Sequence, residues 1–188
     1  WTFHTIPEPD EPGYETWLND SALYTGNAGV WAPMSADIEN GLVYLPVESA
    51  TGDQYGGDRH GDNLFANSLI ALDFRTGKMK WYFQLIHHDI WDMDIPTAPI
   101  LADLPNGKKI VAQVTKQGFV YVFDRINGKP IWPINEIPVP QTDVDGEWTA
   151  PTQPIPELPA PFERQGVTKE DLIDYTPEIR RAVDDLLT

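Results

Sequence analysis

The chain has 188 residues, of which 41% are hydrophobic and 22% charged, so it can bury a core and does not have the composition of a disordered tail. Its 13 Lys and Arg against 29 Asp and Glu give a formal net charge of −16, which argues against general nucleic-acid binding and against docking on anionic lipid through a basic patch. The absence of cysteine excludes disulfides, thiolate metal sites and a cysteine nucleophile.

Short β-strand patterns dominate the first two thirds of the chain. Runs rich in β-branched and aromatic residues, each bounded by Gly, Asn, Asp or Pro, predict strands at residues 42–45, 69–72, 80–83, 110–114 and 119–123. Sustained helical periodicity is absent before the C-terminal end. The sequence therefore predicts an all-β body up to about Trp132.

One pattern occurs twice with the same spacing: a strand ends in Asp, Gly follows four residues later, and Trp follows after four more. The two copies are Asp73, Gly77, Trp81 and Asp124, Gly128, Trp132. Asp caps a turn and Gly supplies a positive φ, so each copy predicts a hairpin, and the period of about 50 residues is typical of propeller blades. Two copies and a stub at Trp1 do not close a ring, so we expect a partial β-propeller from a longer chain, with an ordinary β-sandwich as the alternative.

The densest group of chemically active side chains lies at residues 87–94, His-His-Asp-Ile-Trp-Asp-Met-Asp. In an extended chain Asp92 and Asp94 point to the same side, where two like charges either raise a pKa or hold a hard cation such as calcium or magnesium. The adjacent His87 and His88 face opposite ways in a strand, which favours hydrogen-bonding or packing roles. A solvated loop between blades is the alternative for the whole group.

Two further positions are candidates because of their places beside predicted strands. Lys116 lies in Thr-Lys-Gln-Gly between two strands, where it can complement Asp92 or contact an electron-rich carbonyl oxygen. Trp31 follows a Gly-containing turn, where its indole can be a stacking platform. A solvated lysine and an ordinary packed tryptophan are the alternatives.

The last third of the chain has a different composition. Eight of the 18 prolines fall between residues 133 and 161, so we expect residues 133–167 to hydrogen-bond poorly to themselves and to wrap over a folded body, with a flexible linker as the alternative. Thr168 begins a capping-box pattern, and Thr176-Pro177 followed by an apolar stripe predicts a helix. Residues 168–188 are therefore expected to form a short helical subdomain that packs on the propeller, or to fray.

Taken together, these motifs resemble the pyrroloquinoline-quinone (PQQ) dependent dehydrogenases, quinoproteins built on an eight-bladed propeller. The repeat of residues 73–81 and 124–132 is similar to the tryptophan motif that locks the blades of that family. Residues 87–92 and 115–125 resemble its active-site region, and residues 44–66 and 162–168 are similar to its glucose-dehydrogenase-like branch. The resemblance implies that residues 1–132 are blades from an eight-bladed ring.

The resemblance also implies roles for individual residues. By position, Asp92 is the expected carboxylate that takes the proton of the substrate hydroxyl, and Lys116 is the expected basic residue at a quinone oxygen of the cofactor. Trp31 is the expected indole on which PQQ stacks.

A divalent metal is the second cofactor that the resemblance implies, with Asp92, Asp94 and Glu48 as its candidate ligands. Calcium and magnesium are the expected ions, and a lanthanide stays open because Asp94 matches a ligand position of some lanthanide-using members. The alcohol-dehydrogenase branch has a metal-binding Asn where this chain has Glu48 and Ser49, so one of these residues can substitute, or the ligand lies elsewhere.

The implied function is PQQ-dependent oxidation of a sugar or alcohol hydroxyl in the periplasm, with electrons passed to ubiquinone or a cytochrome. Anchoring to the inner membrane through a region outside this chain stays open, nucleic acid is not an expected partner, and the segment alone is expected to be inactive. Two alternatives remain. One is a non-catalytic periplasmic propeller scaffold with the same repeats, and the other is a metal-dependent hydrolase that uses His87, His88 and Asp89.

Overall fold

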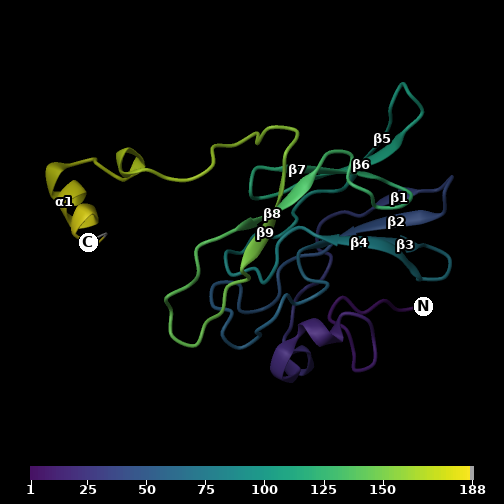
Figure 1. The fold of residues 1–188 in the computed structure, drawn as a ribbon, viewed down its shortest axis with the longest axis horizontal. Coiled ribbons are helices and arrows are strands. Elements are labelled where there is room, and N and C mark those ends of the chain that lie inside the picture. The colour runs from purple at the N-terminus through teal and green to yellow at the C-terminus, as the bar shows by residue number, and fades with distance from the viewer. Residues whose placement is uncertain (187–188) are drawn as a thin grey trace.

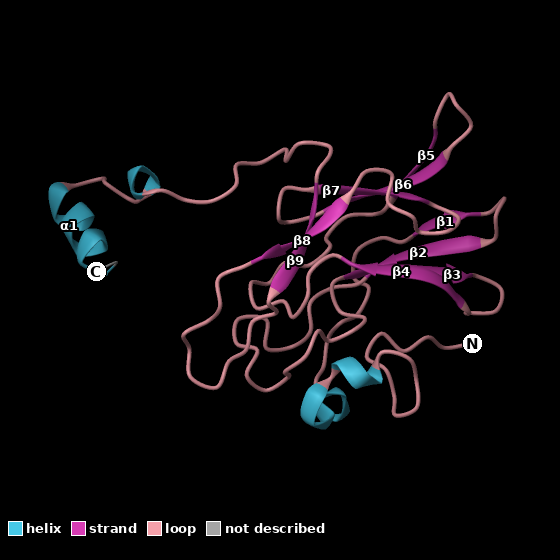
Figure 2. Cartoon of the chain, in the orientation of Figure 1, coloured by secondary structure: helices cyan, strands magenta, loops and turns pink. Residues whose placement is uncertain are grey.

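The computed structural model describes residues 1–186, which form three antiparallel sheets with short helices near both ends (Figures 1 and 2). The first sheet pairs its strands in chain order: β1 (Ser35–Asp37), β2 (Leu42–Pro46), β3 (Ser68–Asp73) and β4 (Met79–Gln84). The second sheet contains β5 (Ile100–Asp103), β6 (Lys109–Val114) and β7 (Val120–Asp124). The third is a hairpin of β8 (Ile134–Pro138) and β9 (Thr152–Pro156).

The two repeats form the predicted hairpin turns. The Asp73 carboxylate accepts the backbone N–H groups of Arg75 and Thr76, each at 3.0 Å, and Gly77 has φ 72°. In the second copy Asp124 accepts two N–H groups at 2.9 and 3.1 Å, and Gly128 again has φ 72°. The carboxylate satisfies donors that the turn leaves free, and glycine reaches this φ without strain, which explains the repeated pattern.

Trp81 lies on the glycine of the second repeat, and Trp1 lies on the glycine of the first. A Cβ atom added at Gly128 would lie 2.6 Å from the ring of Trp81, and one at Gly77 would lie 2.5 Å from the ring of Trp1. The indole N–H of Trp81 also donates to the backbone carbonyl of Arg125 at 3.1 Å. The tryptophan repeat therefore holds one sheet against the next, as the propeller prediction requires, and Trp132 remains exposed at the far side.

One hydrophobic core lies between the first two sheets, and a second cluster joins Trp17 and Phe65 to Ile70 of the first sheet. The largest side chains of the core between the sheets come from β2, β3, β4 and β7, and they include Tyr44, Leu69, Trp81, Tyr121 and Phe123. The ring centroids of Trp81 and Phe123 are 5.8 Å apart. Burying aromatic groups of this size is worth about 2 kcal/mol each, so this contact contributes to the stacking of the two sheets.

The Pro-rich segment was expected to hydrogen-bond poorly to itself, and that expectation is wrong for residues 134–156. Strands β8 and β9 pair from Ile134 with Pro156 to Pro138 with Thr152. A two-stranded ladder gives each strand one free edge, where the missing N–H of proline costs nothing. The hairpin is also tied to the body, because the Tyr121 hydroxyl donates to the carbonyl of Pro154 at 2.8 Å. These residues are therefore not a flexible linker.

The ends of the chain are helical. The 3-10 turns η1 (Tyr14–Thr16) and η2 (Leu18–Leu23) lie beside the first sheet, and they were not predicted. After the hairpin come η3 (Lys169–Asp171), with the capping box at Thr168, and α1 (Pro177–Leu186). The apolar side chains of α1 do not pack on the sheets as expected: the helix extends away from them (Figure 1), and Ile179 and Leu186 are exposed. Residues 187–188 of the predicted helical subdomain lie outside the described part.

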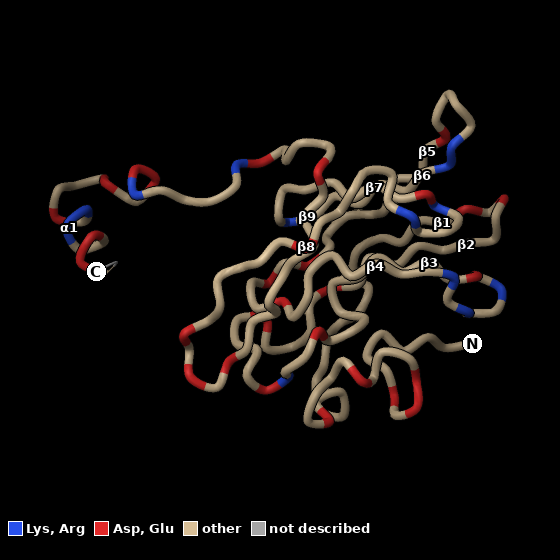
Figure 3. The backbone as a smooth tube through the Cα atoms, viewed as in Figure 1, with Lys and Arg blue, Asp and Glu red and all other residues tan. Residues whose placement is uncertain are grey.

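Charge is distributed unevenly along the fold. Lys and Arg gather at the β3–β4 and β5–β6 turns, whereas Asp and Glu are frequent in the loops at the opposite ends of the sheets (Figure 3). Among the described residues, no helix is both long enough and apolar enough to cross a bilayer.

Candidate functional site

Three loops meet at one edge of the stacked sheets. Strands β2 and β4 flank the antiparallel strand β3, so they run in the same direction and both end at the same edge of the sheet. The loop after β2 carries Glu48, and the loop after β4 carries Asp92 and Asp94. The β6–β7 turn of the second sheet brings Lys116 to the same place. The repeat-driven stacking of the sheets therefore assembles residues that are up to 68 positions apart in sequence.

Lys116 holds the two acidic side chains that were predicted to act together. Its ammonium group lies 2.9 Å from a carboxylate oxygen of Asp94 and 3.4 Å from one of Asp92, and it donates to the backbone carbonyl of Asp92 at 2.8 Å. Both carboxylates therefore face one cation, although the chain at Asp92 is not extended, since its φ is 55°.

Two residues of this ion pair, Asp94 and Lys116, have shifted pKa values. Burial alone would raise the pKa of Asp94, but the Ser49 N–H and the Lys116 ammonium outweigh burial and hold that pKa below its ordinary value. Burial works to lower the pKa of Lys116, yet the carboxylates of Asp94 and Asp92 raise it overall. Both shifts favour the charged forms, so Lys116 and Asp94 form a stable ion pair at neutral pH.

Glu48 joins the site through its neighbours. Its carboxylate accepts the backbone N–H of Gly29 at 3.0 Å, and the next residue, Ser49, donates its N–H to Asp94 at 3.0 Å. Trp31 lies two residues beyond Gly29, and 57% of its surface is exposed. The structure thus brings Lys116 and the two aspartates into direct contact, links Glu48 to them through Ser49, and shows no polar contact between Trp31 and this group among the described residues.

Within residues 1–186 no three His, Cys, Asp or Glu side chains are grouped closely enough to hold a metal ion. The carboxylates of Asp94 and Glu48 are each engaged by a backbone N–H, and Asp94 is also paired with Lys116. A ligand set of Asp92, Asp94 and Glu48 would therefore require other oxygen donors or a rearrangement of these side chains.

The two histidines have separate partners. His88 is fully buried, its Nδ1 lies 2.8 Å from the carbonyl of Gly61, and its ring meets the edge of Trp148 with centroids 4.8 Å apart. Burial lowers the pKa of His88 to about 4, so it is neutral. His87 instead contacts Gln84 and Glu136, at 2.7 and 3.2 Å. The side chains share no ligand site among the described residues, which removes the geometric basis for the hydrolase alternative.

A cleft of about 450 Å³ opens beside Lys116. The acidic loop contributes Trp91 and Met93, the β8–β9 hairpin contributes Ile155, and residues 163–166 form the opposite wall. The cleft combines apolar surface with amide and charged groups, the composition expected of a small-molecule site. Sequence analysis did not predict that the Pro-rich segment lines it, because the β8–β9 pairing was not expected.

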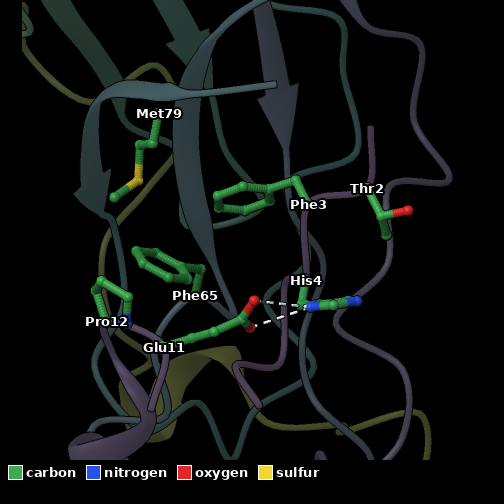
Figure 4. A pocket seen from close by; sticks show the side chains of 7 residues that line it. All are labelled: Thr2, Phe3, His4, Glu11, Pro12, Phe65 and Met79. Carbon is green, nitrogen blue, oxygen red and sulfur yellow. Dashed lines mark hydrogen bonds and ion pairs between the residues drawn. The ribbon is translucent and has the colours of Figure 1, made fainter. Parts of the chain in front are cut away.

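A second cavity, of about 200 Å³, lies between the N-terminal segment and the first sheet (Figure 4). Phe3, Phe65 and Met79 form its apolar wall, and at its rim His4 and Glu11 are hydrogen-bonded at 3.0 Å. The hydrogen bond to Glu11 raises the pKa of His4. None of the predicted site residues lines this cavity.

The whole chain, residues 1–188, matches the PQQ family that is described as glucose/ethanol/alcohol dehydrogenase, β-propeller domain. Quinoprotein glucose dehydrogenase of Escherichia coli (strain K12) is 42% identical over 145 residues, covering 74% of this chain and 18% of that protein. Quinoprotein glucose dehydrogenase A of Acinetobacter calcoaceticus is 44% identical over 170 residues, covering 84% of this chain and 21% of that protein. The chain thus spans about a fifth of the length of these relatives.

Two solved structures show the same arrangement of strands. Quinohemoprotein alcohol dehydrogenase from Comamonas testosteroni is 31% identical with a TM-score of 0.59, covering 77% of this chain and 22% of that chain. A europium-containing methanol dehydrogenase is 26% identical with a TM-score of 0.59, covering 78% and 26%. The expected partial propeller is therefore confirmed.

Proposed function

Since this chain belongs to the PQQ-dependent dehydrogenase propeller family, we propose that it carries the general base and part of the cofactor site of a longer enzyme that oxidises a sugar or alcohol hydroxyl. The observation that supports this most directly is the Lys116 ammonium, which is shared by Asp92 and Asp94 and lines a cleft. A non-catalytic scaffold has no need to hold these three charges together.

The side chains present offer contacts for PQQ, whereas a cation site would need more than they supply as they stand. The exposed Trp31 indole offers a flat apolar face to a planar ring, and the Lys116 ammonium is a suitable donor to quinone or carboxylate oxygens. Asp92, Asp94 and Glu48 carry oxygen donors, the type that calcium or magnesium prefers, with a lanthanide as the alternative, and they would hold the ion only with further oxygen donors or after a rearrangement of these side chains. When bound, PQQ supplies the two-electron oxidising group, and the cation polarises it as a Lewis acid.

The residues of this chain would bind the substrate and move its proton. The carboxylate of Asp92 is half-exposed toward solvent and lies 3.4 Å from the Lys116 ammonium. As a carboxylate it accepts the proton of a substrate hydroxyl as general base. Lys116 keeps its charge throughout and orients the cofactor, while the walls of the cleft restrict the substrate and exclude water.

The relatives suggest the substrate and the electron acceptor. The two glucose dehydrogenases are 42% and 44% identical to this chain, against 34% for the quinohemoprotein alcohol dehydrogenase ADH-IIG of Pseudomonas putida. We therefore place a sugar hydroxyl, such as an aldose C1, before a simple alcohol. Ubiquinone or a cytochrome is the proposed acceptor, and the periplasm, with or without an inner-membrane anchor elsewhere in the protein, is the proposed location.

The test is dye-linked oxidation of glucose and of short alcohols by the whole protein, reconstituted with PQQ and calcium. We expect dye reduction that requires PQQ and is faster with glucose. Faster turnover of short alcohols would assign the alcohol branch instead. No turnover with calcium, magnesium or a lanthanide would reject the enzyme and favour the periplasmic scaffold.

A further inference from the structure

A buried carboxylate lies directly behind the proposed base. Asp89 is 2% exposed, and its two carboxylate oxygens accept four hydrogen bonds from three segments of the chain. Two donors are backbone N–H groups of its own loop, those of Trp91 at 3.0 Å and Met93 at 2.7 Å. The other two are side chains outside that loop, the hydroxyl of Ser49 and the amide of Asn67.

The two backbone donors lie on either side of Asp92. By holding the N–H groups of residues 91 and 93, the carboxylate curls the loop around itself and leaves Asp92 at the tip, with φ 55°. A non-glycine residue rarely adopts this conformation without external constraints, so the buried anion is a physical reason for the loop shape. The same shape directs the backbone carbonyl of Asp92 to Lys116 at 2.8 Å.

The two side-chain donors, Ser49 and Asn67, connect Asp89 to Asp94 and Glu48. Ser49 bonds Asp89 through its hydroxyl and Asp94 through its N–H, at 3.0 Å for the latter. Asn67 donates its amide to Asp89 and to the carbonyl of Met93, and its own N–H bonds the carbonyl of Glu48 at 3.1 Å. One carboxylate therefore connects the loop of Glu48 with the loop of the two aspartates.

A neutral side chain could not replace this group. All four donors bond to a carboxylate oxygen. An amide at this position would place its NH₂ group against at least one donor, and that hydrogen bond would be lost. The buried Arg59 guanidinium, which donates to the backbone carbonyl of Asp89 and to Asn63, supplies the neighbouring positive charge. Removal of the anion would leave several buried donors without an acceptor and would take away one of the carboxylates that balance Arg59.

We infer that Asp89 is a positioning residue that fixes Asp92 and Asp94 relative to Lys116 through its four hydrogen bonds. This rests on the proposed function, since positioning matters for turnover only if Asp92 is the base. Asp89 touches no reacting atom. Its loss is expected to displace the base by about an ångström, which in enzymes lowers the rate by on the order of 100-fold.

The experiment compares Asp89→Asn with Asp37→Asn in the whole protein. Asp37 is a matched control because it is also a buried carboxylate, 5% exposed, but it lies at the β1–β2 turn and pairs with Arg125 at 2.6 Å. Three quantities are measured for each: kcat and KM with glucose, PQQ bound per protein, and hydrogen exchange by mass spectrometry in the peptide containing residues 89–94. The exchange measurement reports the stability of the loop's hydrogen bonds and does not depend on enzyme activity.

For Asp89→Asn we expect kcat to fall by on the order of 100-fold with KM and bound PQQ unchanged, and faster exchange at residues 91 and 93. Asp37→Asn is expected to lower Tm without changing kcat or that exchange. Unchanged kcat or unchanged local exchange in Asp89→Asn would overturn the inference, as would an equal loss of kcat in Asp37→Asn.

A milder variant covers the case in which Asp89→Asn does not fold. Ser49→Ala keeps the carboxylate and removes one of its four donors, so it is expected to lower kcat and to speed the same local exchange. No change in either would overturn the inference. Failure of the proposed function is distinguishable, because the wild-type protein would then show no PQQ-dependent turnover whatever the exchange data show.

Discussion

His88 is the residue whose protonation state is most tightly constrained by its surroundings. Its Nδ1 must carry the proton, because it lies 2.8 Å from the carbonyl of Gly61, and Nε2 is then a buried acceptor without a partner in the described structure. Burial, and then the nearby Arg59 charge, lower the pKa of His88 from 6.5 to about 4. The folded chain therefore binds this proton less readily than the unfolded chain.

That difference predicts acid sensitivity with a defined sign. Between pH 6.5 and about 4 the unfolded state binds more protons at residue 88, so stability falls as pH falls, by up to about 3 kcal/mol across the window. His88→Gln cannot take up this proton, so its Tm is expected to drop less than that of the wild type between pH 7 and pH 4.5. Equal drops, measured by thermal melts, would contradict the assignment.

The residue roles were only partly predictable from sequence. Asp92, Asp94 and Lys116 stand out because charged groups end apolar strands, and the structure brings them together. The positioning role of Asp89 was not predicted, although a short carboxylate followed by N–H groups two and four residues later is a common local pattern. Its other donors, Ser49 and Asn67, come from distant parts of the chain, and no local pattern reveals that convergence.

At the scale of elements, the stacking of sheets depends on tryptophan packing over glycine. Gly128 and Gly107 both lie in hairpin turns with positive φ, 72° and 81°, but only Gly128 is covered by a ring, that of Trp81. A methyl group at Gly107 meets nothing within 4 Å. Alanine substitutions at the two positions therefore separate the free-energy cost of a positive φ from the cost of displacing the Trp81 ring.

Gly128→Ala is expected to destabilise the protein more than Gly107→Ala. Both variants incur about 1 kcal/mol for an alanine at positive φ, but the first must also displace the Trp81 ring from its place between the sheets. Differential scanning calorimetry of the whole protein should show a clearly lower Tm for Gly128→Ala. Matching Tm values for the two variants would mean that the tryptophan contact does not hold the sheets together.

Local patterns predicted β2, β3, β4, β6 and β7, because β-branched and aromatic runs and Asp-to-Gly turns act within about ten residues, but they did not predict the edge strands β1 and β5. The β8–β9 hairpin was not predicted, since its proline content argues against pairing, whereas one two-stranded ladder tolerates it. The N-cap and Pro177 predicted the helix α1. Its position relative to the sheets was not predicted, because an apolar stripe does not reveal which surface it contacts.

At the scale of the whole molecule, the chain covers about a fifth of its curated relatives and holds stacked sheets from one part of a ring. Its proposed cofactor contacts, Lys116 and Trp31, lie at an open edge. The isolated 188-residue chain is therefore expected to bind PQQ weakly, well above micromolar Kd. Tight stoichiometric binding in a fluorescence titration would contradict this and would place the complete cofactor site within the chain.

The central claim, that Asp92 is the base of a PQQ-dependent dehydrogenase, is tested most directly by turnover of Asp92→Asn in the whole protein. The control is Asp143→Asn, which removes the same charge from an exposed loop. We expect both variants to bind PQQ, Asp143→Asn to keep its activity, and Asp92→Asn to lose at least about 100-fold in kcat. Near-normal turnover by Asp92→Asn with PQQ bound would show that the proton of the substrate goes elsewhere.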